Sequence, residues 1–248
     1  MSAVECQAGG HSHPGAFKTE GGRLIKRTEH TESVFYAETL PTVVGLAAFC
    51  PKCFGVVEEG GEFFVLMEDL CHGFAKPSVA DIKMGRTSVG EDNSEERRRE
   101  RMEVEPKTTM GQLGMRFIGK VVYDPKEGKY TKYDKKWGYA LQEAQFNSSL
   151  LHFFQHKDPK VTLFLLQSAV RQVAAILEWF KNQNSFIFLR SSLLFVFDGA
   201  NPTELRVKMI DFAHVIPIRE ESGRDENYLF GLRELLSRLR SLTRSLSA

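Results

Sequence analysis

Residues 77–85 constrain the fold most, because their side chains alternate in character along the chain. In an extended strand, Asp81 and Lys83 lie on one face, about 6–7 Å apart, and the apolar residues that alternate with them lie on the other. The sequence therefore predicts a strand with an apolar face in a core and a polar face on a cleft. A carboxylate that accepts hydrogen bonds from hydroxyls, beside a lysine that holds phosphate oxygens, suits a ligand with both groups. Taken alone, the stretch also fits a solvated strand face.

The composition is that of an ordinary globular protein, with 42% hydrophobic and 26% charged residues over 248 positions. This length is enough for one large domain or two lobes. A net charge of +1 gives no overall field that favours nucleic acid or an anionic membrane, so any anion site must be local. We therefore expect no nucleic-acid partner and no membrane partner.

Four cysteines in a chain of this length do not predict a disulfide framework. No apolar run approaches the ~18 residues of a membrane span, and the first residues lack the pattern of a signal peptide. We expect a cytoplasmic protein, with the nucleus as a second location.

The N-terminal part predicts a short strand over 23–27, a helix over 30–40, and two strands over 54–57 and 63–67. Lys26 on the first strand is a candidate for the lysine that reaches nucleotide phosphates in kinases. Glu38 on the helix is its candidate partner, with a solvated side chain as the equal alternative. The last of these strands runs into Glu68-Asp69-Leu70, which has the form of a kinase hinge whose backbone binds an adenine edge, or is simply a strand end.

Two patterns here have weaker interpretations. Cys50-x-x-Cys53 is half of a zinc site, and its other candidate ligands are Cys6 and the Cys71-His72 pair, so buried thiols are the favoured interpretation. The segment over 9–15, which includes His11-x-His13, predicts either a hairpin tip over phosphates or a frayed terminus.

Lysines interleaved with aromatic residues over 129–138 fit nucleic acid or, equally, a local phosphate pocket. The charged stretch over 91–107 predicts a solvated helix, with Arg97 and Arg101 on one face. The alternative is that these arginines form a wall of a polyanion site.

The sequence of the C-terminal part predicts helices that form a scaffold and one strand that ends in a candidate site residue. Helices over 141–156 and 159–180 carry core residues, the second with an apolar stripe at 4,3,4,3 spacing. Strands over 192–197 and 205–210 deliver Asp211 at a strand end, where nucleotide enzymes hold Mg²⁺; a buried aspartate that caps a turn is the alternative. A last amphipathic helix over 226–239 completes the chain, and residues after 240 are expected to fray.

Several motifs occur in an order that resembles one family. Pro77-x-x-x-Asp81-x-Lys83-x-Gly85 resembles the signature of the inositol polyphosphate kinases. Residues 191–199 resemble that family's serine-rich Leu-Leu strand, residues 209–214 its metal-binding segment, and residues 225–232 the stretch before its last helix. The similarity extends from about residue 9 to residue 239. Within the family, residues 9–11, 35–41 and 209–214 look most like the inositol hexakisphosphate kinases.

The resemblance implies an α+β chain with a two-lobed fold related to protein kinases. A β-rich N-lobe over 1–70 would end in the hinge at 68–70, and an α+β C-lobe would follow over 71–248. ATP would lie in the cleft between them, with Mg²⁺ as the metal. A monomer is expected.

Carried over by position, the family's roles fall on individual residues. The nucleotide would be contacted by phosphate-binding Lys26, hinge residues Glu68 and Leu70, ribose-binding Asp81, adenine-closing Leu194, and Asp211, which would also hold Mg²⁺. Lys83 would lie between the γ-phosphate and the inositol substrate and stabilise the transferred group, so Lys83 and Asp211 are the expected catalytic residues. The expected substrate-binding residues are Lys83, Arg97, Arg98, Arg101, Lys120, Lys135 and His214.

The implied activity is transfer of the γ-phosphoryl group of ATP to inositol hexakisphosphate, with a pyrophosphate product, and to less phosphorylated inositol phosphates. The alternatives are a multikinase or trisphosphate kinase that acts on a free hydroxyl, and a non-catalytic inositol-phosphate-binding module. A protein kinase is disfavoured, because the sequence lacks His-Arg-Asp and Gly-x-Gly-x-x-Gly.

Two departures from the family pattern bear on the substrate. Tyr139 stands where the family often has an arginine, and the helix after Gly85 carries arginines where lysines are common. Both departures fall where inositol phosphates would bind, and neither touches the nucleotide chemistry.

Overall fold

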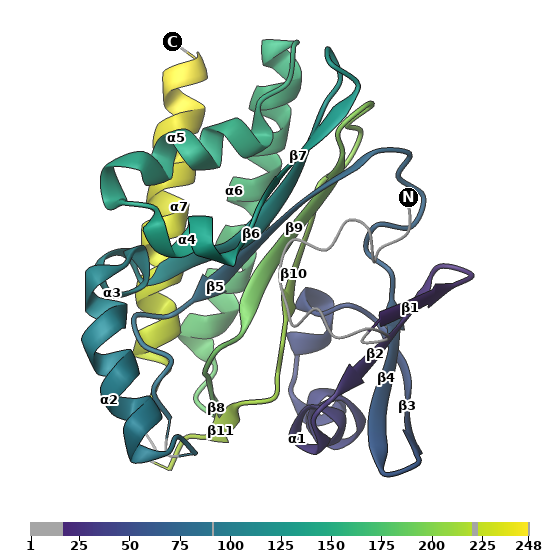
Figure 1. Cartoon of the computed structure of the whole chain (residues 1–248), viewed down its shortest axis with the longest axis vertical. Helices are drawn as coiled ribbons and strands as arrows, with labels where there is room; N and C mark the ends of the chain where they lie inside the picture. Colours follow the sequence, from purple (N-terminus) through teal and green to yellow (C-terminus); the bar gives the residue numbers. More distant parts are fainter. Residues whose placement is uncertain (1–16, 91, 220–222, 248) are drawn as a thin grey trace.

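The computed structural model describes residues 17–90, 92–219 and 223–247, which form two large antiparallel sheets, a short two-stranded one and a layer of helices (Figure 1). The fold class is α+β, as predicted. The predicted hairpin segment at residues 9–15 and Cys6 lie outside the described residues.

The first sheet has the strand order β1-β2-β4-β3. Its strands are β1 (Phe17–Glu20), β2 (Arg23–Thr28), β3 (Cys53–Glu59) and β4 (Glu62–Glu68). Each of its two hairpins turns at a pair of glycines with positive φ, Gly21-Gly22 and Gly60-Gly61, as two-residue hairpin loops require.

Between β2 and β3 the chain is helical, but not as one regular helix. The single helix predicted over 30–40 is wrong in its interior: α1 (His30–Val34) widens into the π-helical turn η1 (Phe35–Thr39) and then tightens into η2 (Leu40–Thr42). Pro41 in the last turn has no N–H to continue an α-helical ladder, which explains the change at the C-terminal end. A further turn, η3 (Leu46–Phe49), leads to β3.

The second sheet has the order β10-β9-β5-β6-β7. Its strands are β5 (Pro77–Met84), β6 (Met115–Asp124), β7 (Lys129–Tyr133), β9 (Ser192–Asp198) and β10 (Arg206–Ile210). β5 lies in the middle, so both of its edges are paired, and its residues are buried apart from the half-buried Lys83. A separate pair of short strands, β8 (Phe186–Phe188) and β11 (Val215–Pro217), was not predicted, since three residues carry no readable periodicity.

Long helices cover one face of the second sheet, and the first sheet lies beyond its other face (Figure 1). These helices are α5 (Glu143–Phe154), α6 (Pro159–Asn182) and α7 (Glu226–Ser247). The stripe predicted on α6 is confirmed, since Leu166, Val173, Leu177 and Phe180 are buried. By length and composition α6 would also suit a membrane span, but here its apolar side packs into the core. The expected fraying after residue 240 is wrong: α7 continues to Ser247, and Leu242 packs on the core.

Shorter helices follow β5 and β7. They are α2 (Glu95–Val104), the turn η4 (Glu105–Lys107), α3 (Thr109–Leu113) and α4 (Lys135–Ala140). The predicted solvated helix is confirmed in α2, which has no buried residue.

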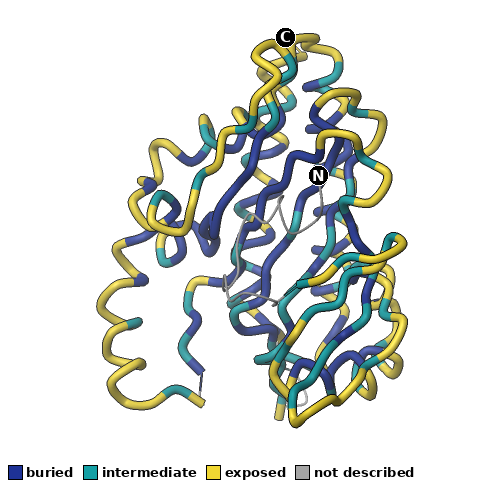
Figure 2. The backbone as a smooth tube through the Cα atoms, turned by 45° about the vertical axis from the view of Figure 1, so that its right-hand side comes forward, coloured by how far each residue is buried: buried dark blue, intermediate teal, exposed yellow. Residues whose placement is uncertain are grey.

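One hydrophobic cluster includes residues of both sheets and of the helices between and behind them. Phe35 stacks on Phe212 at 4.5 Å between ring centroids, and Tyr36 meets the same ring edge-on at 5.6 Å. Figure 2 shows this buried interior running through the second sheet, with exposed backbone at the hairpins of the first. The chain passes from the first sheet to the second between Glu68 and Pro77, and the division into lobes at residue 70 stays a prediction.

Candidate active site

Asp211 is the first residue after β10, and its backbone is left-handed, with φ of 66°. Aspartate tolerates this conformation better than most residues, because its short side chain can bond locally. The turn directs the carboxylate toward the first sheet, where Oδ1 accepts a hydrogen bond of 2.7 Å from Lys26 Nζ. The predicted candidates Lys26 and Asp211 are therefore brought together from opposite ends of the chain.

Lys26 has a second carboxylate partner, and this partner is not the predicted Glu38. Its Nζ donates to Glu32 Oε1 at 2.8 Å, whereas Glu38 is exposed on η1. Glu32 stands in the first turn of α1, directly above the strand end that carries Lys26, and Glu38 lies well beyond the widened turn. Of the two interpretations of Glu38, the solvated side chain is therefore confirmed and the pair with Lys26 is wrong.

Glu32 accepts hydrogen bonds from three donors, two on β2 and one just after β10, although it is almost fully buried. It accepts from Lys26, from the Thr28 hydroxyl, and from the backbone N–H of Phe212 at 3.0 Å. Burial alone would lower the pKa of Lys26, but the carboxylates of Asp211 and Glu32 outweigh it and raise that pKa above its usual value. Lys26 is thus a fixed cation beside Asp211.

On β5, Asp81 and Lys83 share the face that looks away from the helices, as the alternation predicts, and Ile82 and Met84 are fully buried on the other face. Burial raises the pKa of Asp81 to about 7, and the nearby Asp211 carboxylate adds to the effect. Asp81 Oδ1 has no hydrogen-bond partner within the described chain. A buried acceptor without a partner is a position that a ligand hydroxyl can satisfy.

Lys83 is surrounded by both signs of charge. Burial lowers its pKa to about 8; the carboxylates of Asp211 and Asp81 oppose this shift, and the guanidinium groups of Arg116 and Arg101 support it. Lys83 therefore lies between the carboxylate pair and a group of arginines, which is a suitable position for a cation that contacts a transferred phosphoryl group.

Arg116 is a site residue that the sequence analysis missed. It stands opposite Lys83 in the β5–β6 register, is 3% exposed, and its Cζ lies 3.8 Å from the centroid of the Tyr139 ring. Tyr139, one of the two departures from the family pattern, therefore supports an arginine by a cation–π contact. In the sequence, the signal for Arg116 was a charged residue inside an otherwise mostly apolar stretch.

The side chains of the three arginines predicted on α2 have different partners. Arg101 Nη1 donates to the carbonyl of Ser88 at 2.9 Å and lies close enough to Lys83 to affect its pKa. Arg97 is exposed and pairs with Glu100 on the same helix, and Arg98 donates to the carbonyl of Gly90 at 3.4 Å. Of the three, Arg101 is the one whose charge helps to lower the pKa of Lys83.

Lys120 does not line this site. It pairs with Ala80 in the β5–β6 register, so its side chain points to the helix-covered face, opposite to Asp81. There it is 1% exposed, and its Nζ donates to the carbonyl of Ser149 on α5 at 2.8 Å. The rings of Tyr133 and Trp137 lie 4.7 and 5.0 Å from Nζ and complete its surroundings. The expectation that Lys120 binds substrate is therefore wrong.

The remaining predicted substrate residues are Lys135 and His214. Lys135 is exposed at the start of α4. His214 is half-buried, its Nε2 lies 2.7 Å from Arg190 Nη1, and burial, with Arg190, lowers its pKa. The charge of Lys83 also contributes to that lowering.

Residues 68–70 already use several polar groups inside the chain. The N–H of Glu68 donates to Lys52 O at 2.8 Å, and Leu70 O accepts from Arg206 Nη1 at 2.8 Å. The Leu70 side chain belongs to a small apolar cluster with Val79, Val121 and Val196, against which Leu194 packs. This cluster lies on the same sheet face as Asp81 and offers an apolar surface for a flat ring. Adenine contacts to Glu68 and Leu70 stay a prediction.

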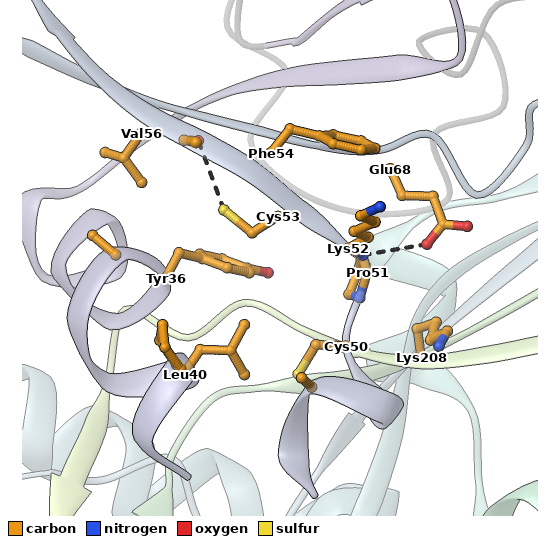
Figure 3. A pocket seen from close by; sticks show the side chains of 14 residues that line it. Tyr36, Leu40, Cys50, Pro51, Lys52, Cys53, Phe54, Val56, Glu68 and Lys208 are labelled. Atoms are coloured by element: carbon orange, nitrogen blue, oxygen red, sulfur yellow. Dashed lines mark hydrogen bonds between the residues drawn. The ribbon is translucent and has the colours of Figure 1, made fainter. Parts of the chain in front are cut away.

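A cavity of about 730 Å³ lies at the edge of the first sheet, against η1, η3 and β3, and the predicted hinge residue Glu68 is part of its lining (Figure 3). Tyr36, Cys50 and Cys53 line it, and burial raises the pKa of both thiols, that of Cys50 to about 12. Within residues 17–90, 92–219 and 223–247, no group of three or more His, Cys, Asp or Glu side chains could hold a metal ion. The described residues therefore give the zinc interpretation of Cys50-x-x-Cys53 no support.

The donor set of the site fits a nucleotide with a divalent cation. Mg²⁺ in nucleotide sites keeps several waters and takes one or two carboxylates together with phosphate oxygens. Asp211 supplies such a carboxylate, and Lys26 and Lys83 supply cations for the phosphates. The buried, unsatisfied Oδ1 of Asp81 supports the fit.

Comparison with known proteins identifies relatives of the chain. A family model described as "Inositol polyphosphate kinase" matches residues 64–240. Inositol hexakisphosphate kinase 3 from Mus musculus is 29% identical over 212 residues, which are 77% of this chain and 53% of that protein. The human inositol polyphosphate multikinase is 26% identical over 166 residues, 65% of this chain and 39% of that protein. The chain spans about half the length, or less, of the curated relatives it matches.

Solved structures give the same fold. An inositol phosphate multikinase from S. cerevisiae, in complex with ADP and Mn²⁺, superposes with a TM-score of 0.79 at 22% identity, over 90% of this chain and 99% of that one. A second inositol phosphate multikinase superposes with a TM-score of 0.70 at 26% identity, over 84% of this chain and 96% of that one. The first similarity supports the fold alone, and the second adds modest sequence similarity to it.

Proposed function

The chain belongs to the inositol polyphosphate kinase family, and we propose that it transfers the γ-phosphoryl group of ATP to an inositol polyphosphate, with inositol hexakisphosphate as the preferred acceptor. The observation that carries the proposal is the convergence of Lys26, Glu32 and Asp211 beside the Asp81–Lys83 face of β5. A relative that binds ADP with Mn²⁺ on the same fold supports nucleotide and divalent-metal use.

The nucleotide would bind across the first-sheet side of this face. Its adenine would rest against Leu194 and the apolar cluster around Leu70, and a ribose hydroxyl would donate to the unsatisfied Oδ1 of Asp81. Lys26, held by Glu32, would contact the phosphates, and Asp211 would hold Mg²⁺. When bound, the metal neutralises charge that develops on the β- and γ-phosphates.

Phosphoryl transfer depends mainly on positioning and electrostatics, because its transition state is loose. Lys83 would stabilise the transferred group, since it lies between the two carboxylates and the arginines. Arg101, Arg116 and His214 would orient the acceptor phosphates. An acceptor phosphate oxygen is already anionic and needs no general base, which suits hexakisphosphate as substrate.

The second candidate is a multikinase that acts on a free hydroxyl, and the 26% identity to the human multikinase favours keeping it. The two activities share the nucleotide site, so they differ only in how the acceptor is held. We further propose that the protein acts as a monomer in the cytoplasm.

A turnover assay with radiolabelled ATP and Mg²⁺ tests the function. Inositol trisphosphate, pentakisphosphate and hexakisphosphate are offered in parallel to the wild type, Asp211→Asn and Lys83→Ala, with the exposed Lys157→Ala as the matched control. We expect label on hexakisphosphate, at least ~100-fold less in the two site variants, and an unchanged rate in the control. Label on only the less phosphorylated acceptors would favour the multikinase. No transfer to any of them would overturn the proposal.

A further inference from the structure

Arg190 is a second non-glycine residue with a left-handed backbone, with φ of 62°, two residues before β9. Its side chain is only 11% exposed, and its donors reach the segment between β5 and α2 and His214 after β10. Nε donates to the carbonyl of Ser88 at 3.0 Å, and Nη2 donates to Asn93 Oδ1 at 2.7 Å. The guanidinium group is therefore fixed in place, and its remaining donor positions define a site.

These donor positions hold the carboxylate of Asp92. Nη1 donates to Oδ2 at 2.9 Å and Nη2 to Oδ1 at 3.1 Å, which is the parallel two-bond geometry that arginine also forms with phosphate. His214 Nδ1 lies 3.1 Å from the same Oδ2. The Asp92 carboxylate is thus bound by Arg190 and His214, although Asp92 comes from an exposed loop and its side chain is 46% exposed.

The Asp92 carboxylate lies next to the position proposed for the acceptor. Arg190 and Arg101 share one acceptor, the carbonyl of Ser88. Arg101 in turn affects the pKa of Lys83, and Lys83 affects that of His214. The Asp92 carboxylate thus contacts the Arg190 guanidinium and His214, and Arg101 donates to the same Ser88 carbonyl as Arg190. Two neighbouring guanidinium groups suit a group with more negative charge than a carboxylate.

We propose that Arg190 and His214 form a phosphate subsite, that Asp92 occupies it as a built-in competitor, and that a phosphate of the acceptor displaces Asp92 when it binds. This proposal rests on the proposed function, since it concerns the acceptor of the same site. A phosphate monoester carries about −1.5 to −2 charges at neutral pH, against −1 for a carboxylate, so it gains more from the same donors.

The proposal predicts an effect on acceptor affinity but not on nucleotide affinity. A ligand that needs the subsite must open the Asp92 contact first, so its apparent affinity is reduced by the fraction of molecules that are open. A ligand that does not reach the subsite, such as ADP, has no such penalty. Removal of the competing charge should therefore tighten acceptor binding and leave nucleotide binding unchanged.

Calorimetric titration of the whole chain with inositol hexakisphosphate, and separately with ADP and Mg²⁺, tests this at fixed ionic strength. We expect Asp92→Asn to bind hexakisphosphate about 5- to 20-fold more tightly than the wild type, with ADP affinity unchanged. Glu96→Gln, which removes one exposed negative charge from the neighbouring α2, is the matched control and should change hexakisphosphate affinity less than about 2-fold. Equal or weaker binding by Asp92→Asn would overturn the proposal. If the Arg190–Asp92 ion pair were only structural, its loss would not increase the affinity for hexakisphosphate.

Two further arms keep the test decisive. Arg190→Gln should weaken hexakisphosphate binding at least about 10-fold, and in that background Asp92→Asn should have no further effect; an undiminished gain there would contradict the subsite. Titration with inorganic pyrophosphate, at saturating ADP and Mg²⁺, reports the subsite without inositol. A gain for pyrophosphate in Asp92→Asn with no hexakisphosphate binding by any variant would uphold the subsite and overturn the proposed acceptor.

Discussion

At the scale of single residues, the site is assembled around two unusual backbone positions. Within the part of the chain that the structure describes, Arg190 and Asp211 are the non-glycine residues with positive φ. Such conformations cost free energy and persist where surrounding contacts hold them, often at functional sites. Here the holding contacts are the bonds of Arg190 to Ser88 and Asn93, and the ion pair of Asp211 with Lys26.

The choice of Glu32 over Glu38 as partner of Lys26 gives the first prediction. Glu32→Gln should lower turnover at least about 10-fold and cost roughly 3–5 kcal/mol of unfolding free energy, because it leaves the buried Lys26 and the Phe212 N–H with a weaker partner. Initial rates and urea unfolding measure the two effects. Glu38→Gln is the matched control and should stay within about 0.5 kcal/mol; equal effects of the two variants would contradict the assignment.

The depressed pKa of Lys83 gives a prediction about pH. With a pKa of about 8, the side chain is charged below that pH and neutral above it, so kcat/KM should fall as pH rises through about 8. Lys83→Arg should be slower overall but should lose this fall up to pH about 9.5, since guanidinium stays charged.

Burial also lowers the pKa of Lys120 to about 8, so this lysine titrates in the same range. The Lys83→Arg variant therefore shows which of the two lysines causes the fall in kcat/KM. A flat profile in the wild type, or an unchanged fall in Lys83→Arg, would rule out Lys83 as the group responsible.

At the scale of elements, close backbone contacts explain glycines within the motifs. Gly231 lies on α7 where a Cβ would come within 2.1 Å of the carbonyl oxygen of Gly114, in the turn between α3 and β6. The same carbonyl accepts from the N–H of Gly85, the last residue of the signature, at 2.8 Å. The turn at Gly114 therefore joins the end of β5 to the last helix.

Gly231→Ala should destabilise the protein by more than about 3 kcal/mol, because neither backbone can retreat without loss of these contacts. Gly128→Ala is the matched control: its φ is +66° but a Cβ there meets open space, so a cost of about 1 kcal/mol is expected from backbone strain. Urea unfolding of both variants is the measurement. A mild effect at Gly231 would show that α7 can move away from the turn.

The motif over 225–232 also has a packing explanation at Asp225. This buried carboxylate accepts from the N–H of Tyr228 at 2.9 Å, as a cap of α7, and from the N–H of Phe188 at 2.7 Å. Tyr228 stacks on Phe180 of α6, with 4.3 Å between the ring centroids. This part of the family pattern therefore stabilises the scaffold behind the site and does not reach the proposed ligands.

At the scale of the whole molecule, the two sheets share one core. The rings of Phe35 and Tyr36, from the segment between β2 and β3, pack on Phe212 of the second half. Trp179 on α6 contacts Phe49 of η3 at 6.3 Å between rings and donates to Val44 O at 2.9 Å. Neither sheet can expose its face without opening the other.

Unfolding should therefore be a single transition. Tryptophan fluorescence of a Trp137→Phe variant, which reports Trp179 at the junction, and far-UV circular dichroism should give the same midpoint in urea. Phe35→Ala should move both midpoints together and cost about 3–5 kcal/mol. Two separate transitions, or a shift in only one of the signals, would mean that the halves unfold independently.

Much of the fold follows from local sequence, because periodicity depends only on neighbouring residues. The strands β2 to β5, β9 and β10, and the helices α5 to α7, follow from alternation and helical stripes, with errors at the ends and inside the segment over 30–40. Asp81 and Lys83 on one face, and Asp211 after β10, are consequences of the same local geometry.

The tertiary structure alone decided which residues meet across the chain. The sequence gives no means to choose Glu32 over Glu38, since the choice depends on where α1 lies over β2. The direction of Lys120 was equally hidden, because β6 is an inner strand with nearly every residue buried, so no alternation of polarity marks its two faces. Arg116, Arg190 and Asp92 became recognisable once packing brought them to Lys83 and His214. Periodicity determines the face on which a side chain lies, and only packing determines what lies opposite.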